Sequence, residues 1–154
     1  VIYMANTTQY HELVDIFFNK IKDYDLANMD ENIATEIAIG YIDSACSQFQ
    51  SCTQDLDNRD DELGQFGIKL SNTNKQMLVN YMCIEFLDSN FLRVSQALKS
   101  RLSTSDFHSL QNPQQLSKVM ELRTMLKSEN DQLAINKSYK DSKLFDLVTN
   151  RKKV

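Results

Sequence analysis

The least polar stretch of the chain, residues 73–98, predicts the centre of the fold. Between positions 76 and 92 only Glu85 and Asp88 are charged, so apolar side chains cover most of the circumference of a helix. Thr73 can cap the start of this helix, in a capping box completed three residues later. A polar joint begins at Asp88, and a second apolar set at helical spacing follows it. A helix of this kind must be buried on several sides, so we expect the other elements to pack around it.

Two amphipathic helices are expected before the central stretch. The first begins at Thr7 or Thr8 and ends near Lys22. The second covers about residues 31–50 and has small residues beside its apolar face, so another helix can approach it closely. The apolar face of the first helix is made of Tyr10, Leu13, Val14, Phe17 and Ile21. The face of the second helix is made of Ile33, Ile37, Tyr41, Ala45 and Phe49.

A long helix is expected late in the chain. Asn112 is a suitable N-cap and Pro113 a suitable first residue, and no helix breaker follows before roughly Asn136. The apolar stripe of this helix is narrow, and Glu129 and Asn130 interrupt it. At 1.5 Å per residue the helix reaches roughly 40 Å, which is longer than a small core can cover. We therefore expect it to project.

The segment 51–71 lacks helical periodicity and combines an acidic run with a short strand-like pattern. Apolar residues alternate with others at its end, which predicts an extended arm of five residues. An isolated strand leaves its backbone hydrogen-bonding groups open, so pairing with a neighbouring copy of the protein is one expectation. The apolar residues of the arm are Phe66, Ile68 and Leu70. The acids of the run are Asp55, Asp57, Asp60, Asp61 and Glu62.

Together these elements predict an all-α protein. We expect a small helical bundle of about four to five helices around the central apolar helix, with a projecting late helix, one short strand-like arm and a flexible C-terminal tail. A single Pro and three Gly in 154 residues favour helices over a fold with many turns. Residues 1–111 would form the helical core, including the acidic loop and arm at 51–71, and residues 112–154 the long helix and its tail.

Charge and cysteine content restrict the setting of the protein. A net charge of −4 disfavours generic nucleic-acid binding, which needs a basic surface, without excluding a local patch. The three cysteines have no metal-ligand spacing, and their odd number without an export signal favours reduced thiols in a cytosolic setting. No segment approaches about 18 uninterrupted apolar residues, so we expect no membrane contact.

The sequence has no pattern typical of catalysis or cofactor binding. His11 and His108 lie far apart and lack the spacing of a metal site. The acidic run does not follow the ligand order of a helix–loop–helix calcium site, because Arg59 takes its fifth position. Packing is a better interpretation of Cys46 and Cys52 than nucleophilic catalysis. We therefore expect neither enzymatic activity nor a metal or cofactor.

The order of these segments resembles the head-to-tail connector proteins, also called adaptor or neck proteins, of tailed double-stranded-DNA phages. The resemblance rests on LVDIFFNKIKDYDL, GYIDSACSQF, QDLDNRDDEL with the arm FGIKL, QMLVNYMCIEFLDS and SKVMELRTMLKSENDQL. These segments cover nearly the whole chain. The resemblance is one of arrangement, since none of them is a catalytic motif.

The resemblance implies a structural role in the phage neck, after assembly in the host cytoplasm. Many copies, commonly twelve, would form a ring that binds the portal protein, extends the DNA channel and offers a surface to the next neck or tail-completion protein. The arm would contact the neighbouring subunit, and the acidic run would face the channel with only passive contact to DNA. The candidate portal-contact residues are Tyr139, Leu144, Phe145, Leu147, Arg151, Lys152 and Lys153.

A second interpretation is a monomeric intracellular helical regulator or binding module whose late helix docks on one partner protein. Surplus apolar faces, a projecting helix, an unpaired strand and the lack of a catalytic pattern suit a subunit of an assembly. The number of copies that assemble distinguishes the two interpretations.

Overall fold

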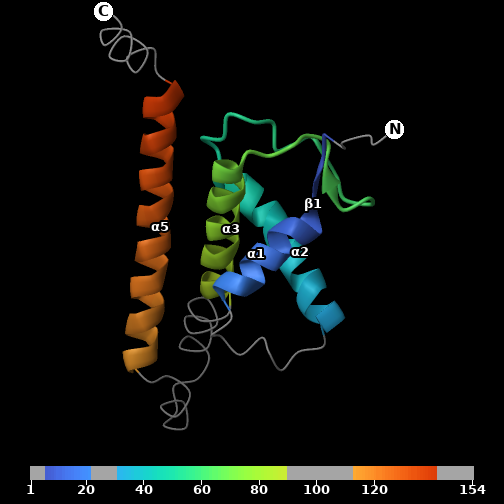
Figure 1. The fold of residues 1–154 in the computed structure, drawn as a ribbon. Coiled ribbons are helices and arrows are strands. Elements are labelled where there is room, and N and C mark those ends of the chain that lie inside the picture. Colours follow the sequence, from blue (N-terminus) through green and yellow to red (C-terminus); the bar gives the residue numbers. More distant parts are fainter. Residues whose placement is uncertain (1–5, 22–30, 90–112, 142–154) are drawn as a thin grey trace, which may run out of the picture.

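The computed structural model describes residues 6–21, 31–89 and 113–141. Within these residues the chain is mainly helical, with a small three-stranded sheet at one end of the bundle (Figure 1). The elements in chain order are β1 (Thr8–Gln9), α1 (Tyr10–Lys20), α2 (Glu31–Gln48), β2 (Arg59–Asp60), β3 (Gln65–Phe66), α3 (Asn72–Leu87) and α5 (Pro113–Asp141). The predicted all-α bundle around a central helix is therefore confirmed.

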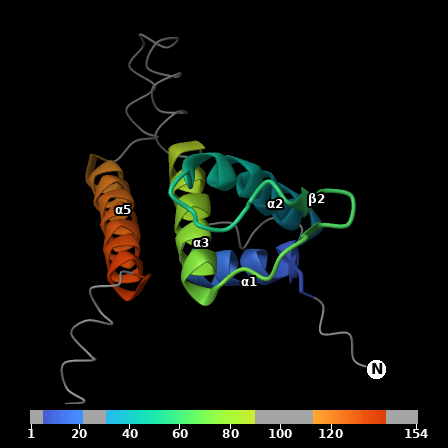
Figure 2. The same cartoon turned by 90° about the horizontal axis from the view of Figure 1, so that it is seen from above.

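Helix α3 lies at the centre of the bundle. It contacts α1 and α2 on one side and α5 on the other (Figure 2). Leu78, Val79 and Met82 are fully buried, as expected for a helix that is apolar on most sides. The N-cap is Ser71, whose Oγ accepts from the Asn74 backbone N–H at 3.2 Å. The expected cap at Thr73 is wrong by two residues, because Thr73 already lies within the first turn. The expected second stretch, from residue 90 onward, lies outside the described residues.

Helix α1 buries the face that its sequence predicts. Tyr10, Leu13, Val14 and Phe17 are buried in the helix, and Ile21 is buried at its C-cap. Thr8 is not the cap, because it belongs to β1 and its Oγ1 accepts from the Leu70 backbone N–H at 2.9 Å. A capping box between Gln9 and Glu12 starts the helix instead.

Helix α2 is rotated relative to the predicted face. Ile33 is 54% exposed, and Ile37 and Tyr41 are only half-buried. Its buried residues are Ala34, Ala38, Ile42 and Ala45, with Phe49 directly after the helix. The alanines turn inward because a small side chain lets α2 approach α1 and α3 closely, whereas larger side chains at those positions would hold the helices apart.

Helix α5 lies alongside α3 and extends beyond it at both ends (Figure 1). Val119 and Leu126 are buried against the core, so the late helix packs on the bundle along much of its length. The two residues that interrupt its apolar stripe make polar contacts. Asn130 Oδ1 accepts from Asn80 Nδ2 at 2.9 Å, Asn130 Nδ2 donates to the Met77 carbonyl at 3.3 Å, and Glu129 pairs with Lys20 Nζ at 3.2 Å.

The predicted arm is part of the core of its own chain. Strand β3 pairs antiparallel with β1 on one side and β2 on the other, with Phe66 opposite both Thr8 and Arg59. Phe66 is 0% exposed and Leu70 is also buried, whereas Ile68 is half-buried. The expectation of an unpaired arm for a neighbouring copy is therefore wrong. Two strands of two residues each complete the sheet: β1 is far away in sequence, whereas β2 lies shortly before β3. Neither has enough residues to show a period-2 pattern.

The core position of Phe66 predicts that substitutions at Phe66 and at nearby Ile68 differ strongly in their effect on stability. Phe66→Ala removes a fully buried ring and should lower the free energy of unfolding by about 3–5 kcal/mol. Ile68→Ala at the half-buried neighbour should cost about 1–2 kcal/mol. Urea unfolding followed by circular dichroism measures both. Equal losses would contradict the packing described for β3.

The Asn80–Asn130 contact predicts a second stability effect. Asn130→Ala leaves Asn80 Nδ2 buried without its acceptor and should lower the free energy of unfolding by about 1–3 kcal/mol. The control is Asn136→Ala on the exposed surface of the same helix, which should change stability by less than about 0.5 kcal/mol. Urea midpoints of the two variants are the measurement, and indistinguishable midpoints would argue against a structural role for the buried amide pair.

Candidate functional site

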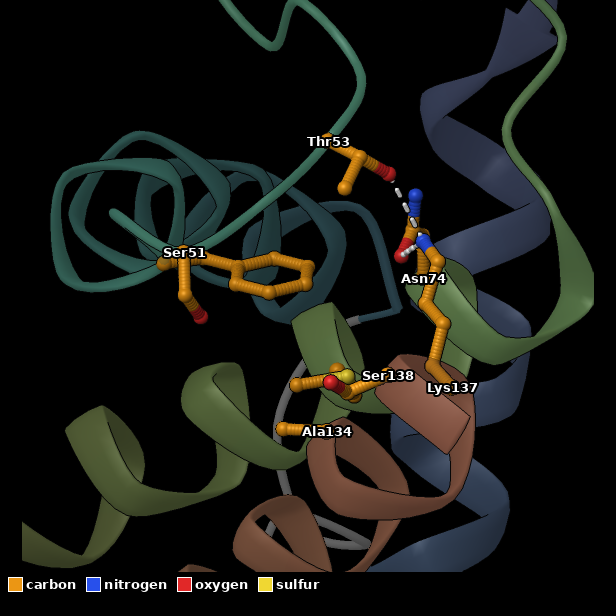
Figure 3. A pocket seen from close by; sticks show the side chains of 8 residues that line it. Ser51, Thr53, Asn74, Ala134, Lys137 and Ser138 are labelled. Atoms are coloured by element: carbon orange, nitrogen blue, oxygen red, sulfur yellow. Dashed lines mark hydrogen bonds between the residues drawn. The ribbon is translucent and has the colours of Figure 1, made fainter. Parts of the chain in front are cut away.

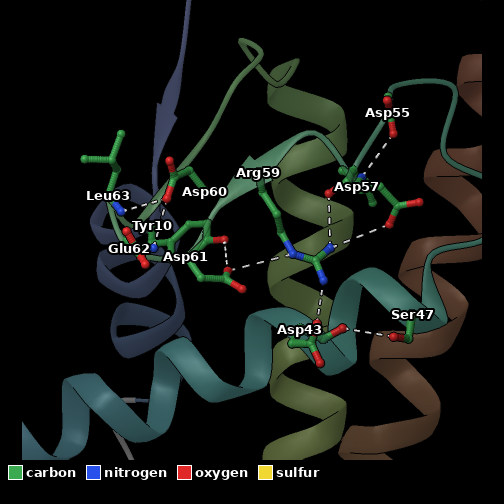
Figure 4. Close-up of polar contacts among 11 residues, drawn as sticks. Tyr10, Asp43, Ser47, Asp55, Asp57, Arg59, Asp60, Asp61, Glu62 and Leu63 are labelled. Carbon is green, nitrogen blue, oxygen red and sulfur yellow. Dashed lines mark hydrogen bonds and ion pairs between the residues drawn. The ribbon is translucent and has the colours of Figure 1, made fainter.

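The acidic run forms an ordered loop between α2 and β3 (Figure 4). Asp55 Oδ1 accepts from the Asp57 backbone N–H at 3.1 Å. Asp60 Oδ1 accepts from the backbone N–H groups of Glu62 and Leu63, at 3.0 and 3.1 Å. Short acidic side chains that bond to the backbone a few residues later are typical of turns. Two acids of the run, Asp55 and Asp60, therefore stabilise the turns of the loop.

Arg59 is the cation around which the loop is arranged. Its Nη2 lies 2.5 Å from Asp43 Oδ1 on α2, and its Nη1 donates to the Leu56 carbonyl at 3.1 Å. The carboxylates of Asp57 and Asp61 lie 3.9 Å from the same guanidinium group. The Arg59 side chain is only 18% exposed, whereas that of Asp57 is 99% exposed. The covered guanidinium thus joins the loop to α2, and the carboxylates of its acidic partners face solvent.

Tyr10 joins the same loop to α1. Its hydroxyl donates to Asp61 Oδ1 at 2.6 Å, and its ring packs edge-on against Phe66 with 5.3 Å between the ring centroids. Burial, the hydrogen bond to Asp61 and the charge of Asp61 together raise the pKa of Tyr10 well above its ordinary value. The tyrosine therefore stays protonated and keeps donating throughout the neutral range.

Two glycines permit the chain path around the loop. Gly64 has φ +63°, and its carbonyl accepts from the Tyr10 backbone N–H at 2.8 Å. A side chain is disfavoured in that left-handed conformation. A Cβ on Gly67 would overlap Asn58 Oδ1, so a side chain at that position would require the Asn58 side chain to move. The sequence spacing of these glycines marks the turn but does not reveal the contact with α1.

Little in the described residues points to metal or nucleophilic chemistry. Among these residues no group of His, Cys, Asp and Glu side chains is arranged to hold a metal ion. Burial raises the pKa of the Cys46 thiol to about 11 and that of Cys83 to about 12. Both thiols are therefore protonated at neutral pH, unlike a nucleophilic cysteine. His11 is exposed on α1, and His108 lies outside the described residues.

A pocket opens where α5 meets the loop after α2 and the first turns of α3 (Figure 3). Its volume is about 500 Å³. Lys137 Nζ on α5 donates to Thr53 Oγ1 at 2.9 Å and to Asn74 Oδ1 at 2.8 Å, and these bonds join the three segments. The pocket is lined by Phe49, Ser51, Thr53, Asn74, Met77, Ala134, Lys137 and Ser138.

The structure separates the predicted site residues into three groups. Phe66 and Leu70 belong to the core, with Ile68 packed at its edge. The acids Asp55, Asp57, Asp60, Asp61 and Glu62 gather in the exposed loop around Arg59. Tyr139 is exposed near the end of α5, and the candidate portal residues from Leu144 onward lie outside the described residues.

Sequence reasoning missed Tyr10, Asp43 and Lys137 as parts of a site. Tyr10 and Asp43 belong to helices that precede the loop, so no sequence spacing links them to it. The single Arg59 among five acids was the available signal, because one cation within such a run is well placed to organise it. Lys137 contacts residues more than 60 positions away in sequence, and no local pattern indicates that.

The Tyr10–Asp61 hydrogen bond predicts a pH-dependent loss of stability. The unfolded state releases the tyrosine proton near pH 10, whereas folded Tyr10 retains it, so the free energy of unfolding should fall as pH rises above about 10. Tyr10→Phe should lose about 1 kcal/mol at pH 8, because one charge-assisted hydrogen bond is removed at a partly solvated site. Between pH 8 and 10.5 the free energy of unfolding of Tyr10→Phe should then decline less steeply than that of the unsubstituted protein.

The control for this prediction is Tyr139→Phe, at a tyrosine that is 67% exposed. Its urea midpoints should follow those of the unsubstituted protein at both pH values. If the urea midpoint of Tyr10→Phe fell with pH as much as that of the Tyr139→Phe control, the inference that folding raises the pKa of Tyr10 would be wrong.

Comparisons with known proteins add no assignment. No protein-family model, no curated protein and no solved structure matches the chain. Within the described ranges, no helix is both long enough and apolar enough to cross a membrane.

Proposed function

We propose that the chain is a structural subunit of a phage neck. Copies of it would form a ring that joins the portal of the DNA-filled head to the next neck or tail component and extends the DNA channel. The observation that best supports this role is the acidic loop, an exposed group of carboxylates held in a defined geometry on a helical bundle. The resemblance in segment order to head-to-tail connectors supplies the biological setting.

The acidic loop has properties suited to the wall of a DNA channel. Phosphate groups are repelled by a surface of fixed negative charge, so DNA can pass without binding to it. The Arg59 guanidinium is mostly covered and faces Asp43, Asp57 and Asp61. DNA would therefore meet the carboxylates before this cation.

Helix α5 provides a fixed base for the proposed portal contact. Lys137, close to the end of the helix, bonds to Thr53 and Asn74 in the core. Tyr139 follows on the exposed surface, and the tail proposed to bind the portal continues from there. The subunit contacts of the ring need a surface other than Phe66 and Leu70, because these side chains are buried within the chain.

The alternative of a monomeric regulator or binding module requires a different use of α5. Its apolar stripe, including Val119 and Leu126, is packed against α3. Docking on a partner would have to use the outer face of the helix or detach the helix from the core. No contact among the described residues favours this second role over the first.

Binding to phage heads tests the proposed function. The purified chain is mixed with DNA-filled heads that lack a neck, taken from the phage that encodes it, and the copies bound per particle are counted after sedimentation. The expected result is saturable binding at about twelve copies. Failure of the folded chain to bind would contradict the connector role.

A matched variant tests the placement of the portal contact. A chain that ends at Asp141 contains every described element, so it should still give a helical circular dichroism spectrum, but it should no longer sediment with heads. The control replaces Glu121 by Gln on the exposed surface of α5 and should bind normally. If the shortened chain still bound heads, the portal contact would have to lie on the bundle.

A further inference from the structure

The pocket beside Lys137 has the size of a small-molecule site, and its lining combines apolar and polar side chains. Its volume of about 500 Å³ falls within the range of about 300–1,000 Å³ that is usual for ligand pockets. Phe49 and Met77 are buried core residues that contribute apolar surface. Ser51 and Thr53 on the loop side and Ser138 on the α5 side contribute hydroxyl groups (Figure 3).

Lys137 gives the pocket a positive charge that its partners do not neutralise. Both acceptors of its ammonium group, Thr53 Oγ1 and Asn74 Oδ1, are uncharged. Among the described residues that line the pocket none is acidic. An ammonium group has three N–H donors, and a ligand carboxylate can take the one that these two bonds do not use.

The ammonium group is also held in position by a buried residue. Asn74 is almost fully buried, and its Nδ2 donates to Gln54 Oε1 at 2.6 Å. The Asn74 backbone N–H bonds to Ser71 at the start of α3. The amide that faces Lys137 therefore cannot turn away, and the positive end of the α3 dipole adjoins the same region.

We propose that this pocket binds a small ligand with a single carboxylate and an apolar body. The carboxylate would pair with Lys137 and accept hydrogen bonds from the surrounding hydroxyls, and the apolar body would lie against Phe49 and Met77. A singly charged group fits because one lysine is the only charged residue of the described lining. This inference does not depend on the connector role, since the pocket lies within one copy of the chain.

Octanoate is a suitable probe, with 1-octanol and octylamine as neutral and cationic analogues of the same chain length. The measurement is the change in the Met77 methyl signal when the full chain, labelled at its methionine methyl groups, is titrated with each compound. Octanoate should shift this signal saturably and bind at least about tenfold more tightly than octanol. Octylamine should not bind.

Variants separate the role of charge from that of shape. Lys137→Gln should weaken octanoate binding by about tenfold or more, and Lys137→Arg should restore part of it. Lys127→Gln removes the same charge from an exposed position on the same helix and should leave octanoate binding unchanged. Ala134→Leu keeps the charge but fills the pocket, so it should prevent binding even if the Lys137 variants fold poorly.

Three results would overturn the proposal. The first is that octanoate leaves the Met77 methyl signal unchanged in the folded protein. The second is that octanol binds as tightly as octanoate, which would make the site simply apolar. The third is that Lys137→Gln and Lys127→Gln have equal affinities for octanoate, which would mean that Lys137 does not contact the carboxylate.

Discussion

Helix α3 is apolar on most of its circumference, and burying it is the constraint on which the rest of the structure depends. An exposed apolar side chain loses roughly 1.5–3 kcal/mol relative to a buried one, so α3 needs neighbours on several sides. Helices α1 and α2 cover one side and α5 the other. The short strands close the end of the core, where Phe66 packs against Tyr10.

Polar contacts then fix how the neighbours sit on α3. An apolar stripe as short as that of α5 would tolerate a shift along the partner helix, because one aliphatic contact can replace another. The Asn80–Asn130 pair allows only one register, since any shift would leave a buried amide without its partner. Lys20 donates to both Asn80 Oδ1 and Glu129 Oε1, and so adds α1 to the same contact.

The sequence was informative where a helix buries one wide apolar face, and less so where packing depends on shape. The face of α1 and the start of α5 at Pro113 follow from local spacing. The rotation of α2 does not, because it depends on how closely Ala34 and Ala38 allow other helices to approach. The pairing of the arm does not follow either, because its partners are two-residue strands at Thr8 and Arg59. The pocket arises from segments that meet only in the folded chain.

Side-chain contacts of two different kinds hold the acidic loop. The pairs made by Arg59 with Asp43, Asp57 and Asp61 join charges that are partly in solvent, and dissolved ions screen such attractions over roughly 8 Å at physiological salt. The bond from Tyr10 has a neutral donor on a buried ring. Concentrated salt would therefore weaken the attachment to α2 more than the one to α1, where the backbone bond from Tyr10 to Gly64 also holds the loop.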